Sequence, residues 1–209
     1  RSARRFWGSL KALPPRFKVF LVAVGLFGIG DFAHTLLILR GTQLLTPQLG
    51  ASDAGRLAIL LYLLHHLINV AAAYPIGAIS DRLGRRGLLT AGYLGAAAMS
   101  LGLAWAQPSF LYLLAFFLLG GLYLAAEETL EKAVGGDMLP ADLRGIGFGL
   151  LATVNGVGDL VSSVVVGVLW TVISPTVAFL YAAVVALLGA GALFLALRGS
   201  RRATPQPSQ

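Results

Sequence analysis

Cysteine is absent from the sequence, and charged residues are scarce. Without a thiol, the chain cannot form a disulfide, a thiolate metal site or a cysteine nucleophile. Only 12% of the residues are charged, whereas a soluble domain carries about 25%. So few charges cannot cover the surface of a water-soluble domain. We therefore expect the lipid bilayer to be the solvent and the main partner of this chain.

Acidic residues are fewer than basic ones, and the usual catalytic patterns are missing. Nine Asp and Glu residues stand against 16 Lys and Arg residues, which gives a formal charge of +7. The basic residues cluster at the ends of apolar runs instead of forming a stripe, so nucleic acid is not an expected partner. The sequence contains no His-Glu-x-x-His, Glu-x-x-His or Gly-x-Ser-x-Gly pattern. We expect no enzyme activity, no catalytic residue, no metal site and no cofactor.

Long apolar runs are what the sequence has in abundance. Hydrophobic residues make up 57% of the chain, and the mean hydropathy is +0.80. A bilayer core needs about 20 apolar residues per helix. Six stretches are long enough, at about 18–45, 56–79, 87–106, 109–133, 144–172 and 176–197. They predict an all-α integral membrane fold in which residues 18–198 form a bundle of six transmembrane helices.

Lysine and arginine are divided unequally between the loops of this bundle. Positive residues in short loops favour the cytoplasmic side. One side receives most of them, whereas the other receives only Arg40 and Arg56. The sequence therefore predicts a multi-pass membrane protein with both termini in the cytoplasm. Residues 1–17 are expected to be a basic cytoplasmic linker, and 199–209 a disordered tail.

Polar side chains lie near the middle of three predicted spans. An ionisable group in the bilayer core costs about 2.5–3.5 kcal/mol on insertion scales, so such groups are candidates for function. The candidates for a substrate or ion pathway are Asp31, His34, Tyr62, His65, His66, Asn69, Asn155 and Asp159. Adjacent residues diverge by about 100° around a helix, so His65 and His66 are not expected to bind one ion.

The fourth predicted span ends in an acidic segment that allows two interpretations. Counted from Pro108, Glu127 is already close to the cytoplasmic boundary. The segment can be interfacial, with Glu128 paired to Lys132 at the favourable i,i+4 spacing. It can equally take part in proton or ion coupling. On the second interpretation, Glu127, Glu128 and Glu131 join the pathway candidates.

Residues 77–87, GAISDRLGRRG, hold the densest charge between apolar runs and predict a tight turn between the second and third spans. Glycine suits a turn that needs close approach or unusual dihedral angles, and a carboxylate such as Asp81 suits a helix N-terminus. The arginines hold the loop in the cytoplasm. The residues expected to act in this turn are Gly77, Asp81, Arg82, Gly84, Arg85 and Arg86.

The spacing Gly-x-x-x-Asp-Arg-x-Gly-Arg-Arg resembles the loop after the second and the eighth helix of the major facilitator superfamily. Residues 128–145 are similar to the region between the tenth and eleventh helices of a bacterial branch, and 31–40 to its seventh helix. The resemblance covers about 17–198. It implies the C-terminal half of a twelve-helix secondary transporter, built as a 3+3 inverted repeat. It also implies the inner membrane of a bacterial cell.

Such a half implies transport of a small solute by alternating access, with or without proton coupling. The first and fourth spans would line the cavity, the second and fifth would face the other half, and the third and sixth would be outer support. Asp81 would lock one conformation by meeting a helix end of the other half. Implied partners are a small-molecule substrate, protons, and the missing N-terminal half or a second copy. In that case Asp31→Asn or Asp159→Asn would reduce transport more than Glu131→Gln.

Two alternatives to this interpretation stay open. The chain can be a six-span membrane protein that associates with itself, or a membrane assembly factor or enzyme that transports nothing. The resemblance predicts neither the substrate nor the direction of transport.

Overall fold

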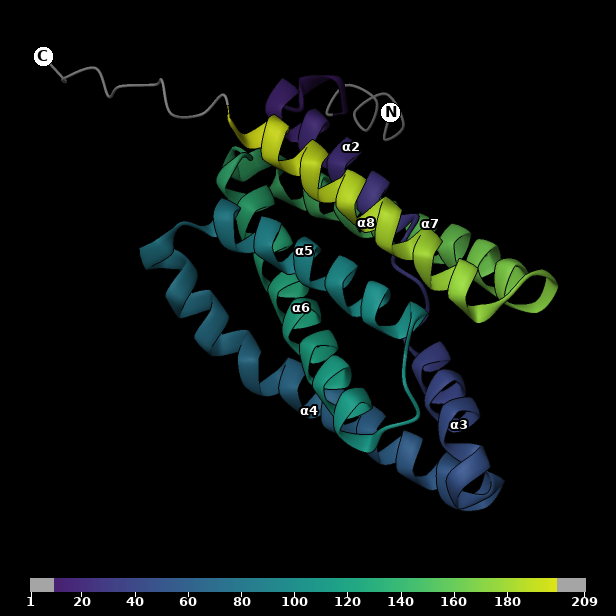
Figure 1. The fold of residues 1–209 in the computed structure, drawn as a ribbon. Coiled ribbons are helices and arrows are strands. Elements are labelled where there is room, and N and C mark those ends of the chain that lie inside the picture. Colours follow the sequence, from purple (N-terminus) through teal and green to yellow (C-terminus); the bar gives the residue numbers. More distant parts are fainter. Residues whose placement is uncertain (1–9, 199–209) are drawn as a thin grey trace, which may run out of the picture.

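The computed structural model describes residues 10–198, which fold into helices joined by short connections (Figure 1). The helices are α2 (Pro15–Gly28), α3 (Thr35–Leu49), α4 (Ala51–Leu83), α5 (Arg85–Ala104), α6 (Phe110–Asp137), α7 (Arg144–Val172) and α8 (Pro175–Arg198), with a short 3-10 turn at Ala141–Leu143. Residues 1–9 of the expected linker and the expected disordered tail at 199–209 lie outside the described residues.

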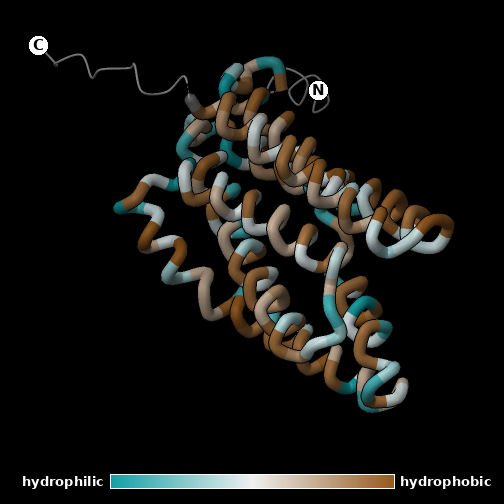
Figure 2. The backbone as a smooth tube through the Cα atoms, in the orientation of Figure 1, coloured by the Kyte–Doolittle hydropathy of each residue, from teal (hydrophilic) through white to brown (hydrophobic). Residues whose placement is uncertain are grey.

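Within residues 10–198, five helices are long and apolar enough to cross a membrane. Four of them are α4, α5, α6 and α8, and the fifth is α7 together with the 3-10 turn that precedes it. Hydrophobic residues recur along each of them and are not confined to one side of the molecule (Figure 2). An outer surface of this kind is stable in lipid and not in water. The helices therefore have the composition of a multi-pass membrane protein.

The first expected span differs from an unbroken helix. α2 ends at Gly28 and α3 begins at Thr35, so the backbone leaves the helical path at residues 29–34. The two pieces have 14 and 15 residues, and each is shorter than a bilayer-spanning helix. We call residues 29–34 the break, and Asp31 lies within it.

Side chains from α7 and α8 supply hydrogen-bond partners to the break. Ser162 donates to the carbonyl of Asp31, Tyr181 donates to the carbonyl of Ile29 over 2.7 Å, and Ser163 accepts from the amide of Ala33 over 3.2 Å. Irregular backbone at membrane depth is tolerated only where protein or water pairs its polar groups. These contacts explain why the helix can be interrupted here.

The two pieces of the divided span pack on different neighbours. α2 lies against α7 and α8, whereas α3 lies against α4, as Figure 1 shows. Gly28 and Gly158 allow α2 and α7 to approach closely, because a Cβ added to Gly158 would lie 2.9 Å from the Cα of Gly28. Small residues at such crossings are typical of membrane helices. The break thus joins two groups of packed helices.

α4 and α7 each leave a long apolar face uncovered. The exposed side chains include Leu60, Leu63, Leu67, Val70 and Tyr74 of α4, and Val157, Leu160, Val164, Val168 and Val172 of α7. Only 22% of the apolar window is buried in each of these helices, against 44–50% in α5, α6 and α8. Lipid or further protein must cover both faces.

The turn between α4 and α5 consists of one residue, Gly84. Its φ of +95° lies in the region that favours glycine, because a side chain there would clash with the backbone. Gly77 differs from the expectation. It lies inside α4, and a Cβ added to it would make only an ordinary contact, 3.6 Å from Cγ2 of Thr129. The turn therefore does not require glycine at position 77.

Candidate functional site

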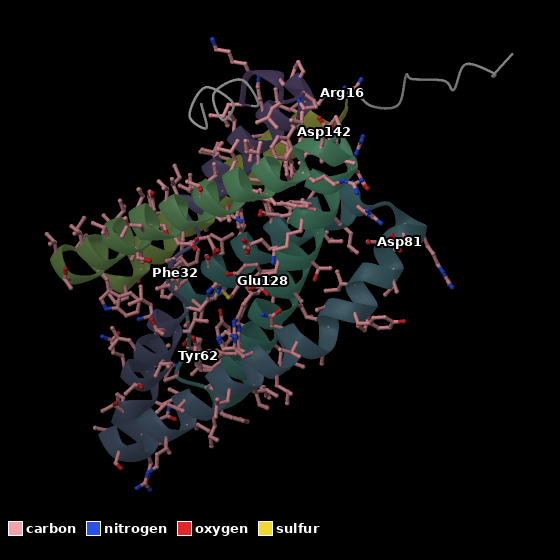
Figure 3. All side chains as sticks on the ribbon, turned by 180° about the vertical axis from the view of Figure 1, so that it is seen from behind. Arg16, Phe32, Tyr62, Asp81, Glu128 and Asp142 are labelled. Atoms are coloured by element: carbon pink, nitrogen blue, oxygen red, sulfur yellow. The ribbon has the colours of Figure 1, made fainter. Side chains whose placement is uncertain are left out.

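A cavity of about 640 Å³ opens between the break, α6 and α7, and His66 of α4 also lines it. In Figure 3, Phe32 of the break and Glu128 of α6, both of which line it, are labelled in the space between the two groups of helices. The predicted residues that line the cavity are Asp31, His34, His66, Glu127, Glu128, Glu131, Asn155 and Asp159. Tyr62, His65 and Asn69 are not among the lining residues.

Five carboxylates from three parts of the fold meet in this carboxylate cavity. The break contributes Asp31, α7 contributes Asp159, and α6 contributes the three glutamates. Lys132 is the only Lys or Arg among the described residues that line the cavity. Like charges repel strongly where the dielectric constant is low, so protons, cations or hydrogen-bond donors must stabilise such a cluster.

Glu131 is the carboxylate with both oxygens occupied. Tyr93 of α5 donates to Oε1, and the amide of Asn155 of α7 donates to Oε2 over 2.7 Å. Only 2% of Glu131 is exposed. The Tyr93 ring also stacks on Phe27 of α2 with ring centroids 3.7 Å apart. Glu131 therefore links α6 to α5 and α7 through these two hydrogen bonds.

Asp31 is held through a tyrosine that also reaches a histidine. Tyr123 of α6 donates to Oδ1 of Asp31 over 3.1 Å and shares a second hydrogen bond with Nε2 of His34. A phenol has one proton, so donation to Asp31 leaves the Tyr123 oxygen as the acceptor for an Nε2–H of His34. The side chain of His34 thus lies beside Asp31 even though a regular helix does not connect them.

Glu127 and Glu128 have different surroundings. Glu128 accepts a hydrogen bond from Asn69 of α4 over 3.2 Å. It forms no ion pair with Lys132, because the three ion pairs of residues 10–198 involve other side chains. Glu127 is only 8% exposed, and its Oε2 has no partner in the described part of the chain. Glu127 and Glu131 are buried within the protein, and α6 continues to Asp137, so these two side chains do not lie on its outer surface.

The histidines of α4 take separate positions. His65 is fully buried, and its Nδ1 lies 3.1 Å from the carbonyl oxygen of Phe117, to which it donates. Its ring therefore belongs to the contact between α4 and α6. His66 lines the cavity. Tyr62 packs its ring on both histidines, with centroid distances of 6.0 Å to His65 and 4.6 Å to His66.

Comparisons with known proteins agree with this architecture. The family model described as Major Facilitator Superfamily matches residues 20–209. The chain belongs to the major facilitator superfamily. It is also similar to an uncharacterized MFS-type transporter, MJ1317, of Methanocaldococcus jannaschii, with 33% identity over 181 residues. The match covers 86% of this chain and 44% of that protein, so the chain spans less than half of its relative. No solved structure matches the chain.

As a member of this superfamily of transporters, the chain is a multi-pass membrane protein. The charged turn between α4 and α5 lies away from the cavity. Arg85 donates to Asp81 at 2.9 and 3.1 Å and to Asp137 at 2.9 Å. This Arg85 triad joins the end of α4, the start of α5 and the end of α6. In Figure 3, Asp81 is far from Glu128. Arg86 donates to the carbonyl of Leu197 over 3.4 Å, and Arg82 is exposed.

The sequence analysis of this superfamily member did not identify three tyrosines near the site: Tyr93, Tyr123 and Tyr181. The third and sixth spans were expected to be outer support, yet α5 supplies Tyr93 to Glu131 and α8 supplies Tyr181 to the break. The sequence of α6 contains a pattern that could have identified Tyr123. Tyr123, Glu127 and Glu131 follow one another at intervals of four residues, which places them on one face of a helix.

Proposed function

We propose that this chain is the C-terminal six-helix half of a secondary transporter that moves a small solute by alternating access. The carboxylate cavity is the observation that carries the proposal. Ionisable groups inside a membrane protein are expensive and mark substrate, ion or proton pathways. Here five of them face one cavity, at the height where the first span is interrupted. Discontinuous helices of this kind form the substrate sites of many transporters.

The helix contacts support an inverted 3+3 repeat. If α2 and α3 are counted together as the first span, its contacts correspond to those of α6, the fourth span. α2 packs on α7 as α6 packs on α4, α2 packs on α8 as α6 packs on α5, and α3 packs on α4 as α6 packs on α7. α5 and α8, the third and sixth spans, pack on each other. Each contact thus has a counterpart in the other repeat.

The uncovered faces of α4 and α7 support the view that a second half is needed. Both present rows of apolar side chains beside the cavity. The 44% coverage of the MFS-type relative agrees with a partner region of similar size. In this arrangement both termini of the half face the cytoplasm, and the cavity lies between the two halves. The break is then a joint that lets α3 move with α4 while α2 stays with α7 and α8.

A flux experiment with the intact parent protein tests the transport proposal without a known substrate. Proteoliposomes are loaded with a defined mixture of sugars, amino acids, organic acids and organic cations, and mass spectrometry follows their release. We expect at least one solute to leave faster than from protein-free liposomes. Asp31→Asn and Glu127→Gln should slow that release. Asp53→Asn is the control, because Asp53 is exposed and pairs with Arg56 away from the cavity.

Two outcomes would separate a transporter half from the alternatives. If no solute leaves faster than from protein-free liposomes, the transport proposal is wrong. The nucleotide sequence upstream of the codon for Arg1 tests whether the chain is half of a larger transporter. We expect it to encode six further hydrophobic segments. An initiator codon there without such segments would overturn the half-transporter proposal. Co-purification of two differently tagged copies would then indicate that a second copy covers α4 and α7.

A further inference from the structure

Acidic side chains outnumber basic ones among the described residues that line the carboxylate cavity. Five side chains that can carry a negative charge line it, and Lys132 is the only lysine or arginine among the described lining residues. Lys132 is itself exposed and makes no ion pair within residues 10–198. A cavity with this balance attracts cations and repels anions, and its low-dielectric walls strengthen the effect.

Hydrogen bonds from side chains of the described residues reach three of the five carboxylates. Of the other two, Asp159 is exposed and Glu127 is buried. Glu131, Glu128 and Asp31 accept hydrogen bonds from side chains on neighbouring helices. Glu127 lines the same cavity, is 8% exposed, and has an unpartnered buried oxygen. A buried carboxylate without a donor is costly, so a donor from outside the chain is needed. Glu127 is therefore the buried carboxylate of the cavity whose hydrogen-bonding capacity the described residues leave unfilled.

Apolar and aromatic side chains form the remaining wall. Phe32 of the break, Leu124 of α6, and Phe148 and Leu151 of α7 line the cavity together with the carboxylates. No group of three or more His, Cys, Asp or Glu residues in the described range is arranged to hold a metal ion. A volume of about 640 Å³ is suited to an organic molecule. Aromatic faces additionally attract organic cations.

We propose that the carboxylate cavity binds an organic cation of the ammonium type, with Glu127 as its main counter-charge and Phe32 and Phe148 against its apolar part. This inference rests on the proposed transport function and names the substrate class. Glu131 has a positioning role, because its two oxygens already accept from Tyr93 and Asn155. Asp31 of the break and Asp159 of α7 line the same cavity and add negative potential.

Binding to the intact purified protein tests the proposal with probes of matched shape. Tetraphenylphosphonium and tetraphenylborate have the same form and opposite charge, and benzyltrimethylammonium and benzenesulfonate make a smaller pair. We expect saturable binding of at least one cation and none of its paired anion above a protein-free micelle blank. Glu127→Gln should weaken cation binding about ten- to a hundredfold, as expected for loss of a charge-assisted contact. Asp53→Asn should leave it unchanged.

Three results would overturn the inference: neither cation binds, an anion binds as tightly as its paired cation, or Glu127→Gln binds the cation as well as the unaltered protein. A second measurement needs no variant, in case Glu127→Gln does not fold. Dicyclohexylcarbodiimide modifies carboxyl groups in membranes, and mass spectrometry locates the product. The bound cation should slow modification of Glu127 at least threefold, and an unchanged rate contradicts the inference.

The flux experiment distinguishes failure of this inference from failure of the transport proposal. A cation that binds in a Glu127-dependent way but never crosses the membrane refutes transport and leaves the ligand class standing. Release of a neutral or anionic solute, with Glu127→Gln fully active, refutes the ligand class and leaves transport standing.

Discussion

The amide of Asn155 on α7 donates a hydrogen bond to Oε2 of Glu131 on α6, with the two atoms 2.7 Å apart. Tyr93 of α5 occupies the other oxygen of Glu131. One helical turn away on α6, Glu127 has a buried oxygen with no such partner. Two glutamates on the same face of one helix thus differ in role. The first ties helices together, and the second is available to a ligand or a proton.

Removing the phenolic hydroxyl group of Tyr93 should lower the stability of the protein without leaving a cavity in its core. Tyr93→Phe keeps the ring that stacks on Phe27 but loses the hydrogen bond to Glu131. Side-chain hydrogen bonds between membrane helices contribute about 0.6–2 kcal/mol, so the free energy of unfolding should fall by that amount. Thermal unfolding of the purified protein measures it. Tyr74→Phe is the matched control, because Tyr74 is 85% exposed, and a similar loss there would contradict the prediction.

A methyl group added to α7 where it contacts α2 should destabilise the protein at Gly158 but not at Gly156. A methyl group at Gly158 would lie 2.9 Å from the backbone of Gly28, whereas one at Gly156 meets nothing within 4 Å. Overpacking of this kind costs about 1–3 kcal/mol, and Gly158→Ala should therefore lower the melting temperature. Gly156→Ala should leave it unchanged or raise it slightly. Equal melting temperatures for the two variants would show that α2 and α7 are not closely packed.

The turn between α4 and α5 should tolerate a side chain at Gly87 but not at Gly84. Gly84 has a φ of +95°, and a Cβ added to Gly87 meets nothing within 4 Å. Residues other than glycine pay about 1–3 kcal/mol in sparsely populated backbone regions. Gly84→Ala should thus reduce the yield of folded protein and its melting temperature, and Gly87→Ala should not. Size-exclusion chromatography after mild heating gives the comparison.

Breaking the Arg85 triad should loosen the adjoining ends of α4, α5 and α6 without unfolding the protein. Asp81, Arg85 and Asp137 are all at least partly exposed, and exposed ion pairs add little stability. Arg85→Gln should therefore speed hydrogen exchange in peptides that contain residues 80–88 and 134–140 at a nearly constant melting temperature. Arg85→Lys should not restore protection, since lysine lacks the planar fork. Arg56→Gln, at the other end of α4, serves as the control.

Hydrophobicity predicted the helices well because each long apolar run has only one stable form in lipid. The break is what this reasoning could not supply. Gly28 and Gly30 only permit an interruption, and the groups that stabilise it, Ser162, Ser163 and Tyr181, are more than 125 residues away in the sequence. Helix periodicity contains no information about such partners. The position of Asp31 outside a helix therefore required the structure.

Depth along the sequence was also a poor guide to burial in α6. Counting from Pro108 placed Glu127 near the membrane surface, but the helix extends to Asp137 and packs on α4 and α5. Glu127 and Glu131 are both buried. The predicted importance of Asp31, Asp159 and Glu127 stays a prediction, and the buried oxygen of Glu127 without a partner in the described residues is the reason to expect that its neutralisation impairs transport.

Water access to the cavity is the most direct measurement of whether it is a transport pathway. Residues 1–209 contain no cysteine, so single cysteines can be introduced into the intact protein once any cysteine elsewhere in it has been replaced. Ser163 lines the cavity, and its neighbour Val164 is 58% exposed on the apolar face of α7. We predict that a membrane-impermeant thiol reagent modifies Ser163→Cys and not Val164→Cys, and that a transported solute changes the face from which Ser163→Cys reacts. Equal reactivity at the two positions, or no reaction at Ser163→Cys from either face, would contradict a water-filled pathway between the break, α6 and α7.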